Sequence, residues 1–119
     1  SRLPTTHLRR YSLRTDGFVS VKAGFSGGEF VTRSFVFSGS ELELNYSTSA
    51  IGSVQVEVQD GEGRPLPGFL LADAPEKFGD QIEGIFSWNG DGDLGRLAGT
   101  TVRLRFVLKD ADLYAFRFR

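Results

Sequence analysis

The stretch TVRLRFVLKDADLYAFRF, residues 101–118, decides the fold class of this chain. In its first half apolar and polar side chains alternate, and the apolar ones are Val102, Leu104, Phe106 and Leu108. A period of two places the apolar side chains on one face of a β-strand and the polar ones on the other. This half is therefore predicted to be a half-buried strand.

A second alternation follows the polar break at residues 109–112. One face of this second strand carries Tyr114, Phe116 and Phe118, and the other carries Leu113, Ala115 and Arg117. We therefore expect the chain to reverse at the break and the two strands to pair with each other.

Composition agrees with a chain built from strands and tight turns. It has 119 residues, with 11 phenylalanines, 15 glycines and no methionine. A single domain is expected for this length, and glycine-rich, aromatic-rich composition favours strands over helices. We assign residues 8–119 to this domain. Residues 1–7 are interpreted as a flexible lead or linker remnant, which suggests a piece excised from a longer protein.

The remaining sequence predicts about eight strands and no long helix. The expected strands are residues 8–14, 18–23, 30–37, 41–46, 54–59, 82–88, 101–109 and 113–118. Residues 41–46 and 54–59 form the clearest hairpin, since each alternates regularly on either side of a polar, glycine-containing break. The predicted fold is all-β, a two-sheet antiparallel β-sandwich of jelly-roll type.

Several partners and chemistries are not expected. The 14 basic and 15 acidic residues give a formal net charge of −1, which provides no footprint for nucleic acid or an anionic membrane. The chain has no cysteine, so disulfides, thiol catalysis and cysteine-based zinc sites are excluded. No stretch approaches the roughly 20 apolar residues of a membrane span. The cellular compartment stays open.

No catalytic residue, cofactor or metal is predicted. The single histidine, His7, lies in the lead, so no histidine-based triad or metal site can be assembled. A carboxylate pair for glycoside hydrolysis could be drawn from acids such as Asp73 and Glu83, but acids in turns are mostly solvated. Asn89, Asp91 and Asp93 copy the first ligands of a calcium loop, yet the later positions do not match. An ordinary turn is favoured there, with a non-EF-hand calcium site as the alternative.

The irregular stretch at residues 69–80 is the best candidate for a binding surface, because irregular loops on rigid sheets often carry recognition residues. Aromatic rings in and near it could stack on sugars. The candidate carbohydrate-binding residues are Phe69, Asp73, Phe78 and Trp88. The alternative for Trp88 is the core, since it shares a strand face with Ile82 and Phe86.

Charged residues on neighbouring strands are predicted to form a second surface. They are Glu41, Glu43, Gln55, Glu57, Arg103 and Arg105. Their cross-strand pairs are each worth about 0.2–1 kcal/mol if exposed to solvent. The same face could instead meet an adjacent domain.

Six segments resemble a known domain: YSLRTDGFVSV (11–21), LNYSTS (44–49), VEVQD (56–60), PGF (67–69), LAG (97–99) and LRFVLKDADLY (104–114). They are similar to the C-terminal β-sandwich domains that follow glycoside hydrolase family 32-like β-propellers in bacterial, planctomycete-type proteins. The resemblance implies a non-catalytic accessory module beside an upstream propeller of the same chain. It carries over no sugar-binding residue. Two functions remain open: weak carbohydrate binding, or a structural domain that packs against a propeller or a second copy.

Overall fold

The computed structural model describes residues 18–23, 27–75 and 81–119, and more than half of these residues lie in β-strands. The strands are β1 (Phe18–Ala23), β2 (Gly28–Val31), β3 (Phe35–Val36), β4 (Leu42–Asp60), β5 (Gln81–Phe86) and β6 (Thr101–Phe118). Two short 3-10 helices, η1 (Leu71–Asp73) and η2 (Gly95–Leu97), interrupt them. The all-β fold class is confirmed. Within the described ranges, no helix has the length and apolar character needed to cross a membrane.

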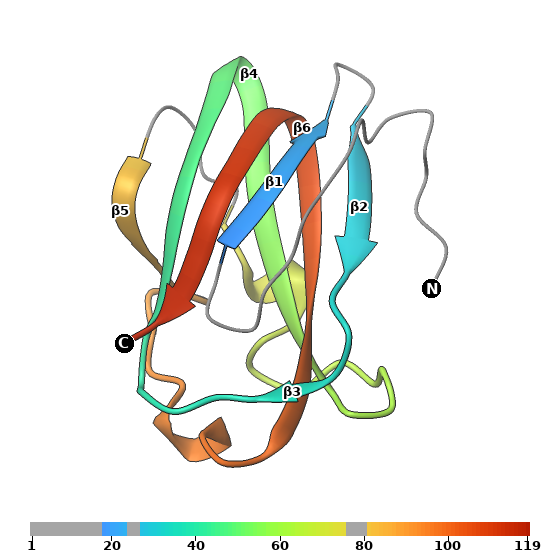
Figure 1. The fold of residues 1–119 in the computed structure, drawn as a ribbon, viewed down its shortest axis with the longest axis vertical. Helices are drawn as coiled ribbons and strands as arrows, with labels where there is room; N and C mark the ends of the chain where they lie inside the picture. Colours follow the sequence, from blue (N-terminus) through green and yellow to red (C-terminus); the bar gives the residue numbers. More distant parts are fainter. Residues whose placement is uncertain (1–17, 24–26, 76–80) are drawn as a thin grey trace.

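All six strands belong to one antiparallel sheet in which β6 is the central strand. The order is β1-β6-β4-β5, and β2 and β3 also pair with β6 (Figure 1). β1 pairs with the second half of β6, whereas β2 and β3 pair with its first half. Four strands therefore depend on β6 for their hydrogen bonds.

The two long strands, β4 and β6, are sharply bent. A straight strand of 19 residues would be about 60 Å long at ~3.3 Å per residue, but the longest dimension of the molecule is 35 Å. Figure 1 shows both strands rising to the top of the view, turning there and descending. Residues 42–48 of β4 pair with 111–118 of β6, and residues 53–60 pair with 102–109. The sheet is thus folded over, and its two halves form two layers.

This arrangement corrects both predicted hairpins. The chain reverses near residues 49–52 and near Asp110, as expected, but neither strand pairs with itself. Each half of β4 pairs instead with a half of β6. Alternation identifies strands and their ends, but it carries no information on which strand lies alongside.

The two bends lie against each other, and glycine permits the contact. A side chain at Gly52 would meet the carbonyl oxygens of Lys109 and Asp110 at less than 3.0 Å. Asp110 itself has a φ of 43°, in the left-handed region. A residue without Cβ on one strand and a left-handed residue on the other therefore let both strands bend at the same level.

The core lies between the two layers. Val54, Val56, Leu104 and Phe106 are each 0% exposed, so their prediction as core residues is confirmed. The rings of Phe106 and Phe116, one from each half of β6, lie 5.4 Å apart between centroids. This contact connects the two layers through the centre of the molecule.

A β-bulge changes the predicted facing of the second half of β6. Asn45 pairs with Ala115 while Tyr46 pairs with Leu113, so Tyr114 is an extra residue on β6. Leu113 and Phe116 are consequently both buried, and Tyr114 is 48% exposed. The prediction that Tyr114 and Phe116 share a face is wrong, because a strict period of two does not account for a residue inserted by a bulge.

Other boundaries also differ from the sequence-based expectation. The predicted strand at 30–37 is divided into β2 and β3, and β5 ends at Phe86, before Trp88. The lead at residues 1–7 and the predicted strand at 8–14 lie outside the described residues. The strands form one folded sheet, and the two-sheet sandwich of jelly-roll type stays a prediction.

Candidate functional site

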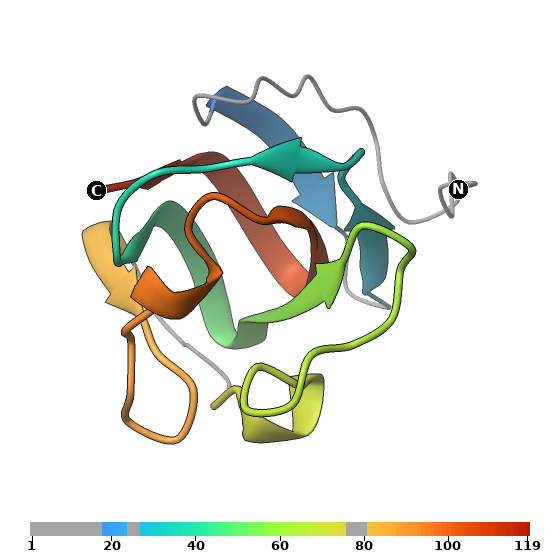
Figure 2. The same ribbon diagram turned by 90° about the horizontal axis from the view of Figure 1, so that it is seen from below.

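The structure brings two of the predicted site regions together at one side of the sheet (Figure 2). Asp73, at the end of η1, accepts two hydrogen bonds from Asn89: the Asn89 backbone N–H donates to its carbonyl oxygen at 2.8 Å, and Nδ2 donates to its Oδ1 at 3.0 Å. Oδ2 of Asp73 also accepts a bond from the Leu70 N–H, at 3.2 Å. Asp73 therefore fastens its own loop to the turn that follows Trp88.

Trp88 is a core residue. It is 1% exposed, and its ring is packed edge-on against Phe69 and Phe86, with centroid distances of 5.4 and 5.0 Å. Its Nε1–H donates a hydrogen bond to the backbone oxygen of Val56 at 2.8 Å. The core alternative for Trp88 is confirmed.

Phe69 is also buried, at 5% exposure, and the guanidinium of Arg96 lies over its ring at 4.8 Å. The prediction that Phe69 is an exposed ring of the loop is wrong, because its side chain points into the core from an irregular segment without a readable period. Phe78 lies outside the described residues. Neither Phe69 nor Trp88 presents a free ring face on which a sugar could stack.

The segment at residues 64–69 closes the outer edge of β4. The Val58 N–H donates to the oxygen of Phe69, and the Leu66 N–H donates to the oxygen of Val58, both at 3.0 Å. The Asp60 N–H donates to the oxygen of Arg64 at 2.8 Å. An uncovered strand edge could pair with another chain, and this segment removes that edge.

The turn at residues 89–93 uses its acidic side chains to hold its own backbone. Asp91 Oδ1 accepts the Asp93 N–H at 2.9 Å, and Asp93 Oδ1 accepts the Gly95 N–H at 2.8 Å. Among the described residues there is no cluster of three or more side chains suited to hold a metal ion. The absence of a specific calcium site stays a prediction.

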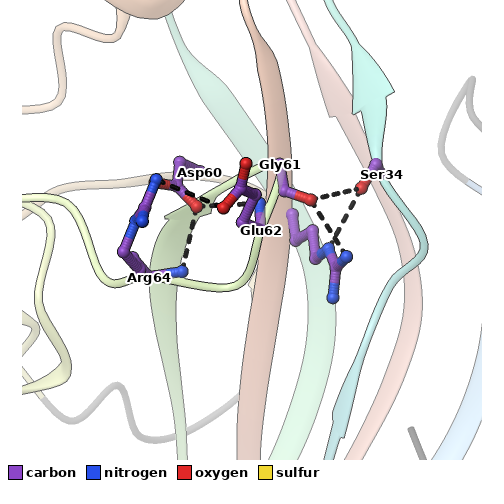
Figure 3. A network of polar contacts seen from close by, with 6 residues as sticks. Ser34, Asp60, Gly61, Glu62 and Arg64 are labelled. Carbon is purple, nitrogen blue, oxygen red and sulfur yellow. Dashed lines mark hydrogen bonds and ion pairs between the residues drawn. The ribbon is translucent and has the colours of Figure 1, made fainter.

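A second polar network fixes the turn after β4 (Figure 3). Asp60 Oδ1 accepts the backbone N–H groups of Glu62 and Arg64 at 2.8 and 3.0 Å, and its Oδ2 lies 3.0 Å from Arg64 Nε. The backbone and side-chain hydrogen bonds from Arg64 lower the pKa of Asp60 to about 2. Asp60 is thus an ionised acceptor that shapes this turn.

Arg103 connects the same turn to the segment between β2 and β3. Its Nη2 donates to the oxygen of Gly61 at 2.9 Å, and its Nε donates to Ser34 Oγ at 3.0 Å. Ser34 Oγ also donates to the oxygen of Gly61 at 3.2 Å (Figure 3). Three segments distant in sequence therefore meet at one carbonyl oxygen.

The predicted charged face is divided in the structure: Arg105 pairs with Glu57, whereas Glu43, on the other half of β4, pairs with Arg117 and Arg119. Arg105 forms two hydrogen bonds to Glu29 on β2, both 2.9 Å, and lies 3.6 Å from Glu57. The hydrogen bond from Arg105 lowers the pKa of Glu29, and the same bond raises the pKa of Arg105. Glu57 is 5% exposed and accepts a bond from Gln59 Nε2 at 2.8 Å. Only the pairing of β2 with β6 could have indicated Glu29.

A second charged group lies on the layer formed by β1, β5, residues 42–48 of β4 and residues 111–118 of β6. We call the outward-facing side of this layer the outer face. Its described residues are Glu43, Asn45, Ser47, Ile85, Asp112, Tyr114 and Arg117. Glu43 is 4% exposed, because Arg117 Nε lies 2.8 Å and Arg119 Nη1 lies 3.6 Å from its Oε1. On the same face Ile85 is 36% exposed and Tyr114 is 48% exposed.

Comparison of the chain with models of known families, with curated proteins and with solved structures gave no match. The described residues define an all-β domain whose loop aromatics are buried and whose loop acids act as turn acceptors or ion-pair partners.

Proposed function

We propose that this chain is a non-catalytic accessory module with a structural role, packing against a neighbouring domain. The observation that supports this most directly is the burial of Phe69 and Trp88, at 5% and 1% exposure. Carbohydrate modules of the sandwich type need aromatic rings that are free on one side for stacking. Here these rings fill the core and the adjoining loop seals the edge of β4.

The outer face has the properties of a surface that meets another domain. Ile85 and Tyr114 offer apolar contact area, and aromatic residues are enriched in such interfaces. The carboxylate of Glu43 is already paired with Arg117 and Arg119, so covering it would not leave an uncompensated acid. The resemblance of the six sequence segments to domains that follow family 32-like propellers supports a propeller of the same chain as the neighbour.

Binding in trans tests this proposal. The domain and its upstream neighbour are prepared as separate polypeptides and mixed in an analytical ultracentrifuge. We expect a complex that Ile85→Ser and Tyr114→Ser each weaken. The matched control is Val36→Ser, which removes an equally apolar side chain, 58% exposed, from β3. If all three variants lose binding equally, or if no complex forms, the outer face is not the contact surface.

Calorimetry against fructans, plant glycans and simple sugars tests the other expected function, weak carbohydrate binding. We expect no heat of binding at millimolar concentration and no change in Trp88 fluorescence. Saturable binding would establish the sugar-binding function in place of the structural one. Turnover of any glycoside that is lost in Asp73→Ala would contradict the non-catalytic assignment.

A further inference from the structure

Asn89 and Gly90 form a dipeptide with a distinctive chemistry. The peptide nitrogen of the residue after an asparagine can attack the side-chain carbonyl carbon, and glycine offers the least steric hindrance to this attack. Both residues are exposed, and nothing lies within 4 Å of the place that a Cβ of Gly90 would occupy. The other asparagine, Asn45, lies within β4 and is followed by Tyr46.

We propose that Asn89-Gly90 is a site of spontaneous deamidation whose rate is controlled by Asp73. In the first step the Gly90 nitrogen forms a bond to Cγ of Asn89, the Cγ–Nδ2 bond breaks, and ammonia leaves with the proton of the Gly90 N–H. The product is a five-membered succinimide. Water then opens this ring, giving aspartate or isoaspartate at position 89, with no oxidant or cofactor required.

The native structure opposes the first step through four hydrogen bonds. The Trp88 N–H donates to the oxygen of Asp91 at 2.8 Å, and the Asp91 N–H donates to the oxygen of Trp88 at 2.9 Å, which closes the turn around the dipeptide. Asp73 holds Asn89 at its backbone N–H and at Nδ2. Ring closure requires rotation about the Asn89 backbone and side-chain bonds, so the reaction proceeds from a locally opened turn.

The reaction also removes the contact that restrains it. Nδ2 of Asn89 now donates to Asp73 Oδ1 at 3.0 Å. After deamidation a carboxylate takes the place of this donor, and two like charges face each other at that distance. An isoaspartate would in addition lengthen the backbone inside the turn. The modification therefore weakens the attachment of the η1 loop to the turn after Trp88, where only the backbone bond from the Asn89 N–H to the Asp73 carbonyl oxygen is kept.

Peptide mapping by mass spectrometry, after incubation of the folded protein at mildly alkaline pH, tests the proposal. We expect deamidation at Asn89 and none at Asn45, and a faster reaction at Asn89 in urea than in the folded chain. Asp73→Ala should accelerate the reaction of the folded protein about fivefold, the factor expected for the loss of one hydrogen bond. Asp73→Asn keeps an acceptor oxygen at this place and should react at nearly the wild-type rate.

Circular dichroism of each variant confirms that the accelerated rate belongs to a folded protein. The proposal is overturned if Asn89 stays intact in the urea-unfolded chain, or if folded Asp73→Ala and wild type react at the same rate. If Asp73→Ala does not fold, the proposal is decided by the rate in Asp73→Asn and by the comparison of folded and unfolded wild type. A second expected result is that Asn89→Asp, the product mimic, has a lower melting temperature than wild type at neutral pH and regains part of the difference at acidic pH.

Discussion

Replacing Trp88 by phenylalanine tests whether this residue is structural. The change removes the indole N–H that donates to the Val56 oxygen at 2.8 Å, in a site where Trp88 is 1% exposed. An acceptor left without a partner in such a place costs about 1–3 kcal/mol. The smaller ring also gives up part of its buried contact with Phe69 and Phe86, worth about 1 kcal/mol more. We expect a loss of about 2–4 kcal/mol in the free energy of unfolding.

The assay is urea denaturation followed by far-ultraviolet circular dichroism, because Trp88 is the only tryptophan and its removal abolishes the tryptophan fluorescence signal. The matched control is Tyr114→Phe, which removes a hydroxyl from a residue that is 48% exposed. This hydroxyl lies 3.0 Å from Ser47 Oγ at the exposed surface, so the stability should change by about 1 kcal/mol or less. A loss below about 1 kcal/mol for Trp88→Phe, or equal losses in the two variants, would refute the assignment of Trp88 to the core.

Three further predictions concern the core, the turn at residues 89–93 and the pH dependence of stability. Leu104→Ala should cost about 2–5 kcal/mol in chemical denaturation, because Leu104 is 0% exposed; a loss under about 1 kcal/mol would show that the register of β6 is wrong. Thermal melts in calcium and in chelator should coincide, and a calcium-dependent rise abolished by Asp91→Ala would contradict this expectation. The pKa of Asp60 is lowered from 3.8 to about 2 in the folded chain, so its ionised form stabilises the fold above pH 3.8, and this contribution is lost as the pH falls through about 2. Asp60→Asn should therefore be less stable than wild type at neutral pH and equal to it below about pH 2; a gap between the two that is the same at both pH values would contradict this reasoning.

The sequence predicted the strands and most of the core, because period-two alternation is a direct consequence of strand geometry. Val54, Val56, Leu104 and Phe106 were all placed correctly. The sequence could not predict which strands pair with each other, since the two predicted hairpins and the observed pairing of β4 with β6 bury the same side chains. Local pattern also cannot reveal the bulge at Tyr114, which depends on the register against β4.

For the candidate site, even less could be predicted from local sequence patterns, because they do not show which residues meet in space. Asp73 was singled out, and the structure shows its carboxylate accepting hydrogen bonds from the Leu70 N–H and from Asn89 Nδ2. Phe69 was misplaced because an irregular segment has no period to read. Glu29 was missed because its partner, Arg105, lies far away in sequence and is brought near only by the pairing of β2 with β6.

The central place of β6 bears on how the chain can fold. β1, β2, β3 and β4 all precede β6 in sequence, and each of them pairs with it. Until β6 is synthesised and docked, these strands have unsatisfied edges, and closing such long loops is entropically costly. Folding is then expected to be slow, in the millisecond to second range typical of non-local β-topologies, and cooperative rather than stepwise along the chain. The nascent strands are most exposed to misassociation with one another before β6 arrives.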